Sequence, residues 1–423
     1  MEKVKWVDIL KLKVSYGENG NDQGMNYYAY ADQYNTSYNS TTGEYSITMY
    51  RMGNEKLTWE TKKSWNIGID FALFKNRLTG SLEVYTGTTS DLLWSKNLPS
   101  SSGKTVNSFY TNIGAVRNSG IEFAVDANII RTKDINWSVN IALAHNKNKI
   151  TELDPTIAEY GQRNSNSILK VGGSLMHAYM IQYAGVDPEN GRAQYWKDTY
   201  KYKLDENGNP TSDILLDGDG NYVIESSEKT YNIDEATRRD CGDILPKLQG
   251  GFGTTLAAYG FDLTCQFAFQ LGGKYYDGAY QQLMHNGQEV GHAMHRDLLN
   301  AWSPENKNSN IPRLSTASVD DPGSGSQTPM DRFLTSSDYL TLTNLSLGYN
   351  LPRKWVTPLS LRSIRLYVSG ENLFLLTARK GMDPRFQSSN TSLSVGSYTA
   401  GGGLQAGAYS AMRAITGGLT VTF

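Results

Sequence analysis

The stretch that decides the fold is Trp65-Asn66-Ile67-Gly68-Ile69-Asp70-Phe71-Ala72-Leu73, which is followed after a turn by Leu78-Thr79-Gly80-Ser81-Leu82-Glu83-Val84-Tyr85. In the first run the odd positions are apolar and the even ones are small or polar, and the second run alternates in the same manner. Because successive side chains of a β-strand point to opposite faces, this period of two predicts strands with one apolar and one polar face. The two runs therefore predict a β-hairpin.

The same alternation returns along most of the chain, without a helix-period stretch of comparable length. It is poorest in 175–184 and 192–198. Many runs are close to the ~10 residues of a tilted membrane-spanning strand. We predict about twelve strands, at 8–17, 64–74, 78–87, 117–131, 135–146, 175–184, 192–198, 249–259, 261–271, 338–350, 363–374 and 409–423.

The connections between these strands alternate between long and short. The short ones are 75–77, 131–134, 185–191, 260 and 351–362, and each is flanked by connections of about 28 residues or more, as in outer-membrane barrels. The polar faces carry neutral amides and hydroxyls, which suit a wet lumen. We therefore expect an all-β fold, an antiparallel transmembrane β-barrel segment with short periplasmic turns and long extracellular loops. A soluble β-sheet protein is the alternative.

Composition excludes several other classes of protein. The 423 residues are 39% hydrophobic, with a mean hydropathy of −0.48, and contain no window of 18 apolar residues, which excludes a helical membrane protein. Charged residues reach only 19%, while Gly (41) and Tyr (27) are abundant. A net charge of −2 gives no reason to expect nucleic acid, and two cysteines exclude a disulfide scaffold.

Both ends of the chain are informative. The first residues lack the apolar core and cleavage site of a signal peptide, so we expect either a cytoplasmic chain or part of a longer one. At the other end a final strand is predicted in which alternate residues are apolar and the last one is aromatic. This arrangement is similar to the signal read by the outer-membrane insertion machinery, and it comprises Ile415, Leu419, Val421 and Phe423.

Several motifs resemble those of SusC/RagA-type TonB-dependent transporters. They lie in the order of that family over nearly the whole chain: WETKK at 59–63 before NIG at 66–68, NIGAVRNSGIE at 112–122, WSPEN at 302–306, DYLTLTNLSLGYNLP at 338–352, RLYVSGENLF at 365–374 and GMDP at 381–384. Each motif alone would be weak, and their shared order makes the resemblance specific. It covers the C-terminal half of such a transporter.

The resemblance implies that residues 1–423 are about twelve strands of a 22-stranded barrel. The signal peptide, the plug domain and the first barrel strands of the family have no counterpart here, so we expect a piece of a longer receptor. The implied function is TonB-dependent uptake of glycans or peptides across the outer membrane, with the C-terminus in the periplasm. The implied partners are a SusD-like surface lipoprotein, the TonB complex through the missing N-terminal part, the insertion machinery and outer-membrane lipid.

Two functions of other classes remain open at this point. A passive porin-like barrel would have to close with the strands present, and a soluble glycan-binding β-sheet protein would not need detergent. Neither alternative, nor the transporter, requires catalysis, and we find no nucleophile elbow or distinct pair of carboxylates in the sequence. We expect no enzyme activity.

Three patterns suggest ligand chemistry. SGKT at 102–105 resembles a phosphate loop but has Leu98 where glycine is required, so an external loop is expected instead. His285, His292 and His295 are clustered, although an ordinary loop is the better interpretation. A weak calcium-loop candidate has Tyr222 in place of the turn glycine, which favours a plain polar turn; its ligands would be Asp217, Asp219, Asn221, Glu225 and Glu228.

Aromatic residues have two expected places. Those near strand ends suit interfacial girdles: Trp65, Tyr85, Trp137, Tyr259, Tyr349 and Tyr367. Those in long loops could contact substrate or a partner, or simply pack the loops; the candidates are Trp94, Tyr110, Tyr275, Tyr276, Tyr280, Trp302 and Tyr398. Cys265 is expected to face lipid and Cys241 to lie in a loop, so no disulfide is expected.

Overall fold

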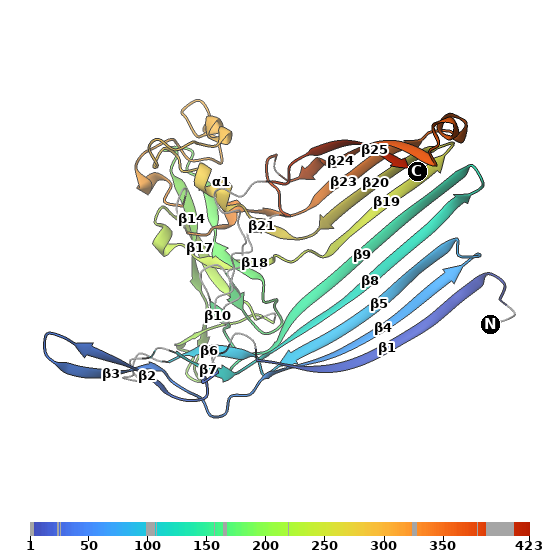
Figure 1. Ribbon diagram of the computed structural model, residues 1–423. Helices are drawn as coiled ribbons and strands as arrows, with labels where there is room; N and C mark the ends of the chain where they lie inside the picture. Colours follow the sequence, from blue (N-terminus) through green and yellow to red (C-terminus); the bar gives the residue numbers. More distant parts are fainter. Residues whose placement is uncertain are drawn as a thin grey trace.

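A computed structural model of the chain describes residues 4–22, 25, 27–98, 106, 108–155, 157–163, 167–218, 220–323, 328–378, 380–385 and 410–423. Its largest element is a curved ten-stranded antiparallel sheet (Figure 1). The strands pair in chain order: β1 (Val7–Asn21), β4 (Glu60–Leu73), β5 (Leu78–Ser90), β8 (Ala115–Arg131), β9 (Ile135–Glu152), β19 (Leu248–Ala258), β20 (Phe261–Leu271), β23 (Tyr339–Asn350), β24 (Ser363–Thr377) and β25 (Ala414–Thr422). We call this sheet the wall. Strands β1 and β25 are its two edges.

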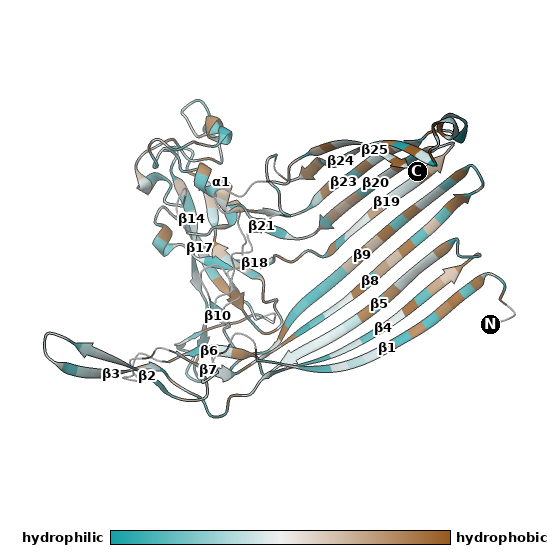
Figure 2. Cartoon of the chain, in the orientation of Figure 1, coloured by the Kyte–Doolittle hydropathy of each residue, from teal (hydrophilic) through white to brown (hydrophobic). Residues whose placement is uncertain are grey.

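The two faces of the wall differ in chemistry, as the alternation predicts. Val14, Ile67, Val84 and Ile121 lie side by side in the register of β1, β4, β5 and β8, and each is at least 43% exposed. An apolar face that remains exposed on a long antiparallel sheet is typical of a barrel wall that faces lipid. Figure 2 shows the resulting bands of apolar and polar residues along β8 and β9.

The opposite face carries polar and charged side chains that bind one another. The Lys13 ammonium lies 2.7 Å from carboxylate oxygens of both Asp70 and Glu83, which come from the next two strands. Further along the wall the side-chain amides of Asn140 and Gln266 are within hydrogen-bond distance, at 3.3 Å. Such a hydrated polar face is typical of a barrel lumen.

The structure corrects the number of wall strands from about twelve to ten among the described residues. The segments 175–184 and 192–198 do not join the wall. Instead β12 (His177–Ile181) pairs with β18 (Arg238–Asp243), and β14 (Ala193–Tyr200) lies between β13 (Tyr183–Val186) and β17 (Ile224–Thr230). In β12 four consecutive residues are buried, so this strand lacks the exposed apolar face of a wall strand.

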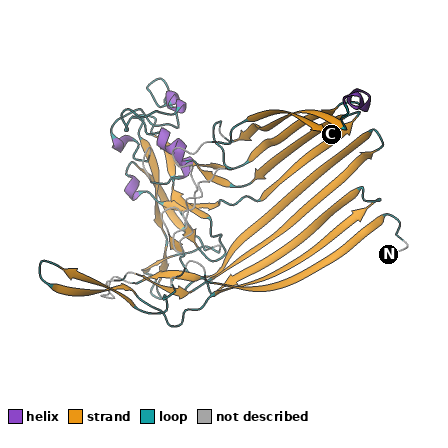
Figure 3. Ribbon diagram, viewed as in Figure 1, coloured by secondary structure: helices purple, strands orange, loops and turns teal. Residues whose placement is uncertain are grey.

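The long and short connections lie at opposite ends of the wall. The short turns, the start of β1 and the end of β25 share one end, while the long connections form small sheets and helices at the other (Figures 1 and 3). The predicted short turn at 185–191 is an exception, because it belongs to the long-loop end. The remaining elements at that end are β2 (Gln33–Asn39), β3 (Glu44–Arg51), β6 (Leu93–Asn97), β7 (Ser108–Asn112), β10 (Gln162–Arg163), β11 (Ile168–Leu169), β15 (Tyr202–Leu204), β16 (Pro210–Ile214), β21 (Lys274–Tyr276), β22 (Leu334–Ser336), α1 (Gly278–Leu283) and the 3₁₀ turns η2 (Ile233–Glu235), η3 (Arg296–Asn300), η4 (Ser318–Asp320) and η5 (Asp331–Phe333).

One short turn contains helical structure. Between β23 and β24 the chain forms α2 (Arg353–Val356) and the 3₁₀ turn η6 (Thr357–Leu359). Among the described residues, all helices are too short or too polar to cross a membrane.

The main hydrophobic cluster of the described residues lies outside the wall. It joins residues of two long connections, 153–247 and 272–338, which we together call the loop domain. Its buried members are Ala178, Met180, Ile181, Ala193, Tyr195, Ile244, Tyr276, Met284, Leu298, Met330 and Phe333. Because the two connections are far apart in the sequence yet share one core, the loop domain is a folded unit rather than a set of separate loops.

Candidate functional site

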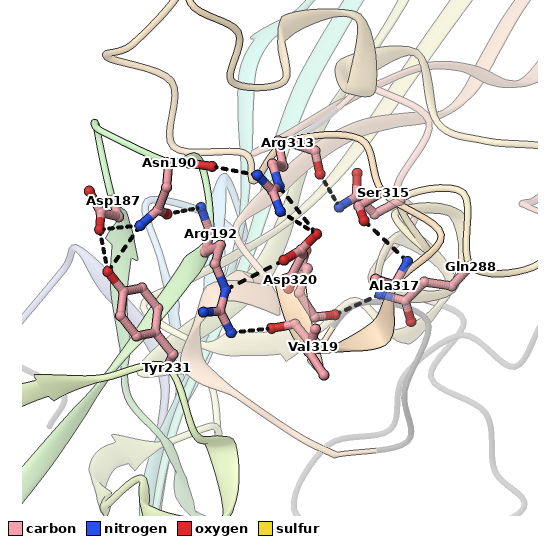
Figure 4. Close-up of polar contacts among 12 residues, drawn as sticks. Asp187, Asn190, Arg192, Tyr231, Gln288, Arg313, Ser315, Ala317, Val319 and Asp320 are labelled. Carbon is pink, nitrogen blue, oxygen red and sulfur yellow. Dashed lines mark hydrogen bonds and ion pairs between the residues drawn. The ribbon is translucent and has the colours of Figure 1, made fainter.

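A polar clamp joins the two connections of the loop domain (Figure 4). The Asp320 carboxylate, only 5% exposed, lies 2.9 Å from a guanidinium nitrogen of Arg313 and 3.4 Å from one of Arg192. The Arg313 guanidinium also donates to the carbonyl of Asn190 at 3.2 Å, and Arg192 donates to that of Val319 at 3.1 Å. The turn at 187–192 is thereby fixed to the segment 313–320.

A second ion pair lies inside the loop domain. The Arg332 guanidinium contacts the Asp321 carboxylate at 3.1 Å, and both side chains are almost fully buried. The same guanidinium lies 4.9 Å from the ring centroid of Tyr183, and burial raises the pKa of the Tyr183 phenol. Together with the hydrophobic cluster, these contacts give the loop domain a fixed internal geometry.

A pocket of about 200 Å³ opens within the first connection of the loop domain. Strands β11, β12, β14, β17 and β18 contribute to its walls. The pocket lies close to the long-loop end of β9, because Ile150 there is hydrogen bonded through its backbone to Gly172 and Gly173 at 2.8 and 2.7 Å. Its lining residues are Tyr160, Ile168, Lys170, Tyr179, Asp198, Tyr200, Gly220, Asn221, Tyr222, Ile224, Arg238, Arg239 and Asp240.

Tyrosine rings dominate this pocket. The Tyr222 ring stacks on that of Tyr160, with centroids 6.3 Å apart, and tilts against Tyr200 at 5.3 Å. The Arg163 guanidinium lies 4.4 Å from the Tyr222 centroid and 5.4 Å from that of Tyr179. A guanidinium at this distance from a ring face makes a favourable cation–π contact. We call the pocket lined by these rings the tyrosine pocket.

Two carboxylates of the tyrosine pocket are held ionised by cationic neighbours. Asp240 accepts from Lys170 at 2.6 Å and from His177 at 2.5 Å; burial alone would raise the pKa of Asp240, but these hydrogen bonds prevail and lower it. Asp198 accepts from Arg239 at 2.7 Å. Its pKa is also lowered, because the hydrogen bonds from Arg239 and Ser227 outweigh the effect of burial.

The chemistry of the tyrosine pocket is that of binding. Its aromatic faces can stack on a flat apolar surface, and its charged and amide groups can bind polar substituents. In the described part of the chain, His, Cys, Asp and Glu side chains are not grouped in threes that could hold a metal ion.

The calcium-loop candidates are spread over a turn and a strand. The Asp217 carboxylate accepts from the backbone of Asn221 at 2.8 Å and so closes its own turn. The Asn221 side-chain oxygen instead accepts from the Lys170 ammonium, also at 2.8 Å. Glu225 and Glu228 lie on β17, and Asp219 is outside the described residues. Calcium binding stays a prediction.

The three histidines do not form a cluster of ligands. His285 is buried, His292 lies 2.7 Å from the Glu289 carboxylate, and His295 caps η3. The phosphate-loop resemblance at 102–105 falls outside the described residues.

The loop aromatics chosen from the sequence are mostly engaged in packing. Tyr275 and Tyr276 are 1% and 8% exposed, inside the loop domain. Trp94 packs against a smaller cluster around Ile150, and Trp302 donates its indole hydrogen to the Pro188 carbonyl at 3.1 Å. Loop packing thus accounts for the position of these four residues.

Three further aromatics complete this set. Tyr280 donates to Asp297 at 2.9 Å, and the Tyr110 ring centroid lies 5.6 Å from the Arg51 guanidinium. Tyr398 is outside the described residues.

Sequence reasoning missed the tyrosine pocket. Its four tyrosines are separated by long stretches of chain and come together only because the small sheets of the loop domain pair as they do. The local signal was limited to the high tyrosine content between 195 and 202, which does not indicate which rings meet.

Two of the aromatics expected in interfacial girdles are on the other face of the wall. Tyr85 is paired in register with Asn66 and Gly120, and its hydroxyl donates to Asn146 at 3.3 Å. Tyr367 shares a face with Asp262 across β23. Both therefore face the polar lumen, because parity along the strand, rather than proximity to its end, decides the side. By contrast, Trp65 and Trp137 are 50% and 37% exposed.

Comparisons with known proteins agree with the wall and its loops. The family model for the TonB dependent receptor-like β-barrel matches residues 4–373. TonB-dependent receptor P3 of Formosa agariphila is 31% identical over 98% of this chain, and TonB-dependent receptor SusC of Bacteroides thetaiotaomicron is 27% identical over 92%. These two alignments cover 39% and 36% of the relatives' own lengths, so the chain spans well under half of them.

Solved structures agree with this result. The RagAB peptide transporter matches all of this chain and 42% of its own, with a TM-score of 0.72 and 26% identity, and its "closed-closed" state gives a TM-score of 0.73 with 25% identity over the same shares. The wall, the placement of the long loops and these matches have a single explanation: the chain belongs to the TonB-dependent receptor β-barrel family, whose members are proteins of the outer membrane.

Proposed function

We propose that the chain is the ligand-facing part of an outer-membrane importer that takes up glycans in a TonB-dependent manner. The observation that carries this proposal is the tyrosine pocket, which lies in a folded domain at the mouth of a wall with a polar inner face. A rigid aromatic site at the entrance suits capture of a large nutrient, and the polar face beneath provides a hydrated path.

Peptides are the second candidate substrate. The titles of the structural neighbours name a peptide transporter, and an antiparallel loop sheet with an edge strand such as β17 (Ile224–Thr230) could pair with an extended peptide. The abundance of tyrosine rings in the pocket favours glycans, because a flat sugar face stacks on an aromatic ring while a peptide backbone needs free strand edges.

The family resemblance extends the proposal to partners and orientation. A SusD-like surface lipoprotein would act at the long-loop end, and the TonB complex would supply energy. The short-turn end, with Phe423, would face the periplasm. The passive porin-like alternative predicts uptake that is independent of energy.

Deletion of the gene in its native host tests the proposal. We expect loss of growth on at least one glycan as the sole carbon source, restoration by the intact gene, and loss of uptake when the proton-motive force is collapsed. A SusD-like lipoprotein should co-purify with the tagged receptor. Unchanged growth on every glycan together with lost growth on peptides would reverse the order of the two candidates, and uptake that persists without a proton-motive force would favour a passive pore.

A further inference from the structure

We propose that the tyrosine pocket binds a single acidic sugar unit, one that carries a carboxylate or a sulfate ester. This inference rests on the proposed function and narrows its substrate class. It comes from three properties of the pocket: its charge balance, the geometry of the arginine on its rings, and its size.

Cations outnumber carboxylates around the tyrosine pocket. Lys170, Arg238 and Arg239 line it, Arg163 lies on its rings, and only Asp198 and Asp240 oppose them, so four cationic side chains face two anionic ones. The two carboxylates are already bound by the ammonium of Lys170, by His177 and by Arg239. This excess of cationic side chains produces a positive potential in the pocket, which favours an anionic ligand.

Arg163 can bind an anion while it keeps its contacts with the tyrosine rings. Its guanidinium carbon lies 4.4 Å from the ring centroid of Tyr222 and 5.4 Å from that of Tyr179. The N–H donors of a guanidinium lie in its plane and stay available for two parallel hydrogen bonds to a carboxylate or sulfate. Among the described residues, none is in ion-pair contact with Arg163.

The size of the tyrosine pocket limits what it can hold. A volume of about 200 Å³ is below the ~300–1,000 Å³ of pockets that enclose a drug-sized molecule. A single sugar ring or one amino-acid side chain matches this volume, whereas a whole oligomer would have to extend out of the pocket.

The rings and strands favour the sugar over an acidic side chain. Tyr160, Tyr179, Tyr200 and Tyr222 provide more ring surface than a short carboxylate side chain needs, and the C–H face of a pyranose can pack against such rings. The central lining strand, β14, has both edges occupied by β13 and β17, so a peptide backbone cannot pair with it and would need an outer strand such as β17.

Ligand-observed NMR on the full-length receptor in detergent tests this proposal with monosaccharides, since the pocket holds one unit. The probes are methyl glucuronide, methyl galacturonide, galactose 6-sulfate, neutral methyl glucoside and N-acetyl-aspartate amide. We expect at least one acidic sugar to bind about tenfold or more tightly than the neutral sugar, with weaker binding at high salt. The uronides and the sulfated sugar separate the two sources of negative charge.

Substitutions connect the binding to the pocket. Arg163→Gln should weaken binding of the acidic sugar about tenfold or more, and Arg163→Lys, which keeps the charge, should weaken it less. The matched controls, Arg131→Gln at the end of β8 and Tyr202→Phe on β15, lie outside the pocket and should leave binding unchanged. Partial binding by Arg163→Lys shows that the loop domain still folds when Arg163 is replaced.

Each outcome decides between the proposals. Equal binding of acidic and neutral sugars, binding of the aspartate derivative alone, no binding of any acidic sugar, or full binding by Arg163→Gln would overturn the acidic-sugar proposal. If any of these occurs while the receptor still supports TonB-dependent uptake of a glycan, the proposed function stands without it. If glycan uptake itself is absent, the proposed function fails independently.

Discussion

The clamp of the loop domain predicts a large effect of the substitution Asp320→Asn. The change keeps the shape of the side chain but removes the negative charge between Arg192 and Arg313. Breaking a fully buried ion pair from one side costs about 3–5 kcal/mol. The two arginine side chains are 31% and 41% exposed, so water would recover part of this cost, and we expect about 2–3 kcal/mol.

Hydrogen exchange followed by mass spectrometry measures this loss locally. At about 1.4 kcal/mol for each factor of ten, amides that are protected by the clamp should exchange about 30- to 150-fold faster in Asp320→Asn. The amide of Arg313, which donates to the Gly191 carbonyl at 2.8 Å, reports on the contact directly. Amides of the wall strands should be unaffected.

A matched control comes from the surface of the same domain. Glu228 is 72% exposed and lies 3.6 Å from the Lys197 ammonium, and such pairs contribute little. Glu228→Gln should therefore leave exchange unchanged. If Asp320→Asn also changed exchange by less than about threefold, the reasoning that Asp320 holds the two connections together would be refuted.

Three further predictions concern pH, the lumen and assembly. Hydrogen bonds from His177 and Lys170 lower the pKa of Asp240 below its usual 3.8, so this carboxylate stabilises the fold above that pH. The protection factors of amides in β12 and β18, which correct for the intrinsic effect of pH on exchange, should therefore fall as the pH drops below about 4; equal protection factors at pH 6 and pH 3 would contradict this. Gly120→Val places a side chain against the Tyr85 hydroxyl and the backbone carbonyl of His145 and should destabilise the wall by about 1–3 kcal/mol, measured as a lower thermal midpoint, whereas an unchanged midpoint would show that both neighbours shift without cost. Phe423→Ser should reduce the amount of receptor recovered in outer membranes, and wild-type yield would exclude Phe423 from the insertion signal.

The wall could be predicted from the sequence because each of its residues meets one of two contrasting environments. Ile67 and Val84 face outward and Asp70 and Glu83 face inward, so alternation alone reveals both the strand and its orientation. The predicted strand ends are less accurate where the two faces of the wall no longer lie in different environments. Strand β9 continues to Glu152 rather than ending at 146, since its last residues pack against the loop domain.

The loop domain could not be predicted in the same way. Its core joins Met180 and Tyr195 of one connection with Tyr276 and Met330 of another, and a local pattern does not encode which distant segments share a core. Local alternation therefore predicts the segments 175–184 and 192–198 as wall strands, although their poor alternation is the visible sign of burial on both sides. The sequence does predict on which face of the wall Tyr85 and Tyr367 lie. Tyr85 is two residues from Glu83 and Tyr367 is two residues from Arg365, so each tyrosine shares the face of its charged neighbour.

The continuity of hydrogen bonding between wall and loop domain bears on how the tyrosine pocket could bind tightly. Hydrogen bonds run from Ile150 on β9 to Gly173, from Lys247 to Leu271 on β20, and from Gln270 on β20 to Ser337, at 2.7, 2.9 and 2.8 Å. The loop domain thus contacts the wall at both β9 and β20 rather than through one hinge. Side chains that are held in place before a ligand arrives lose little conformational freedom on binding, so more of the contact energy is available for affinity.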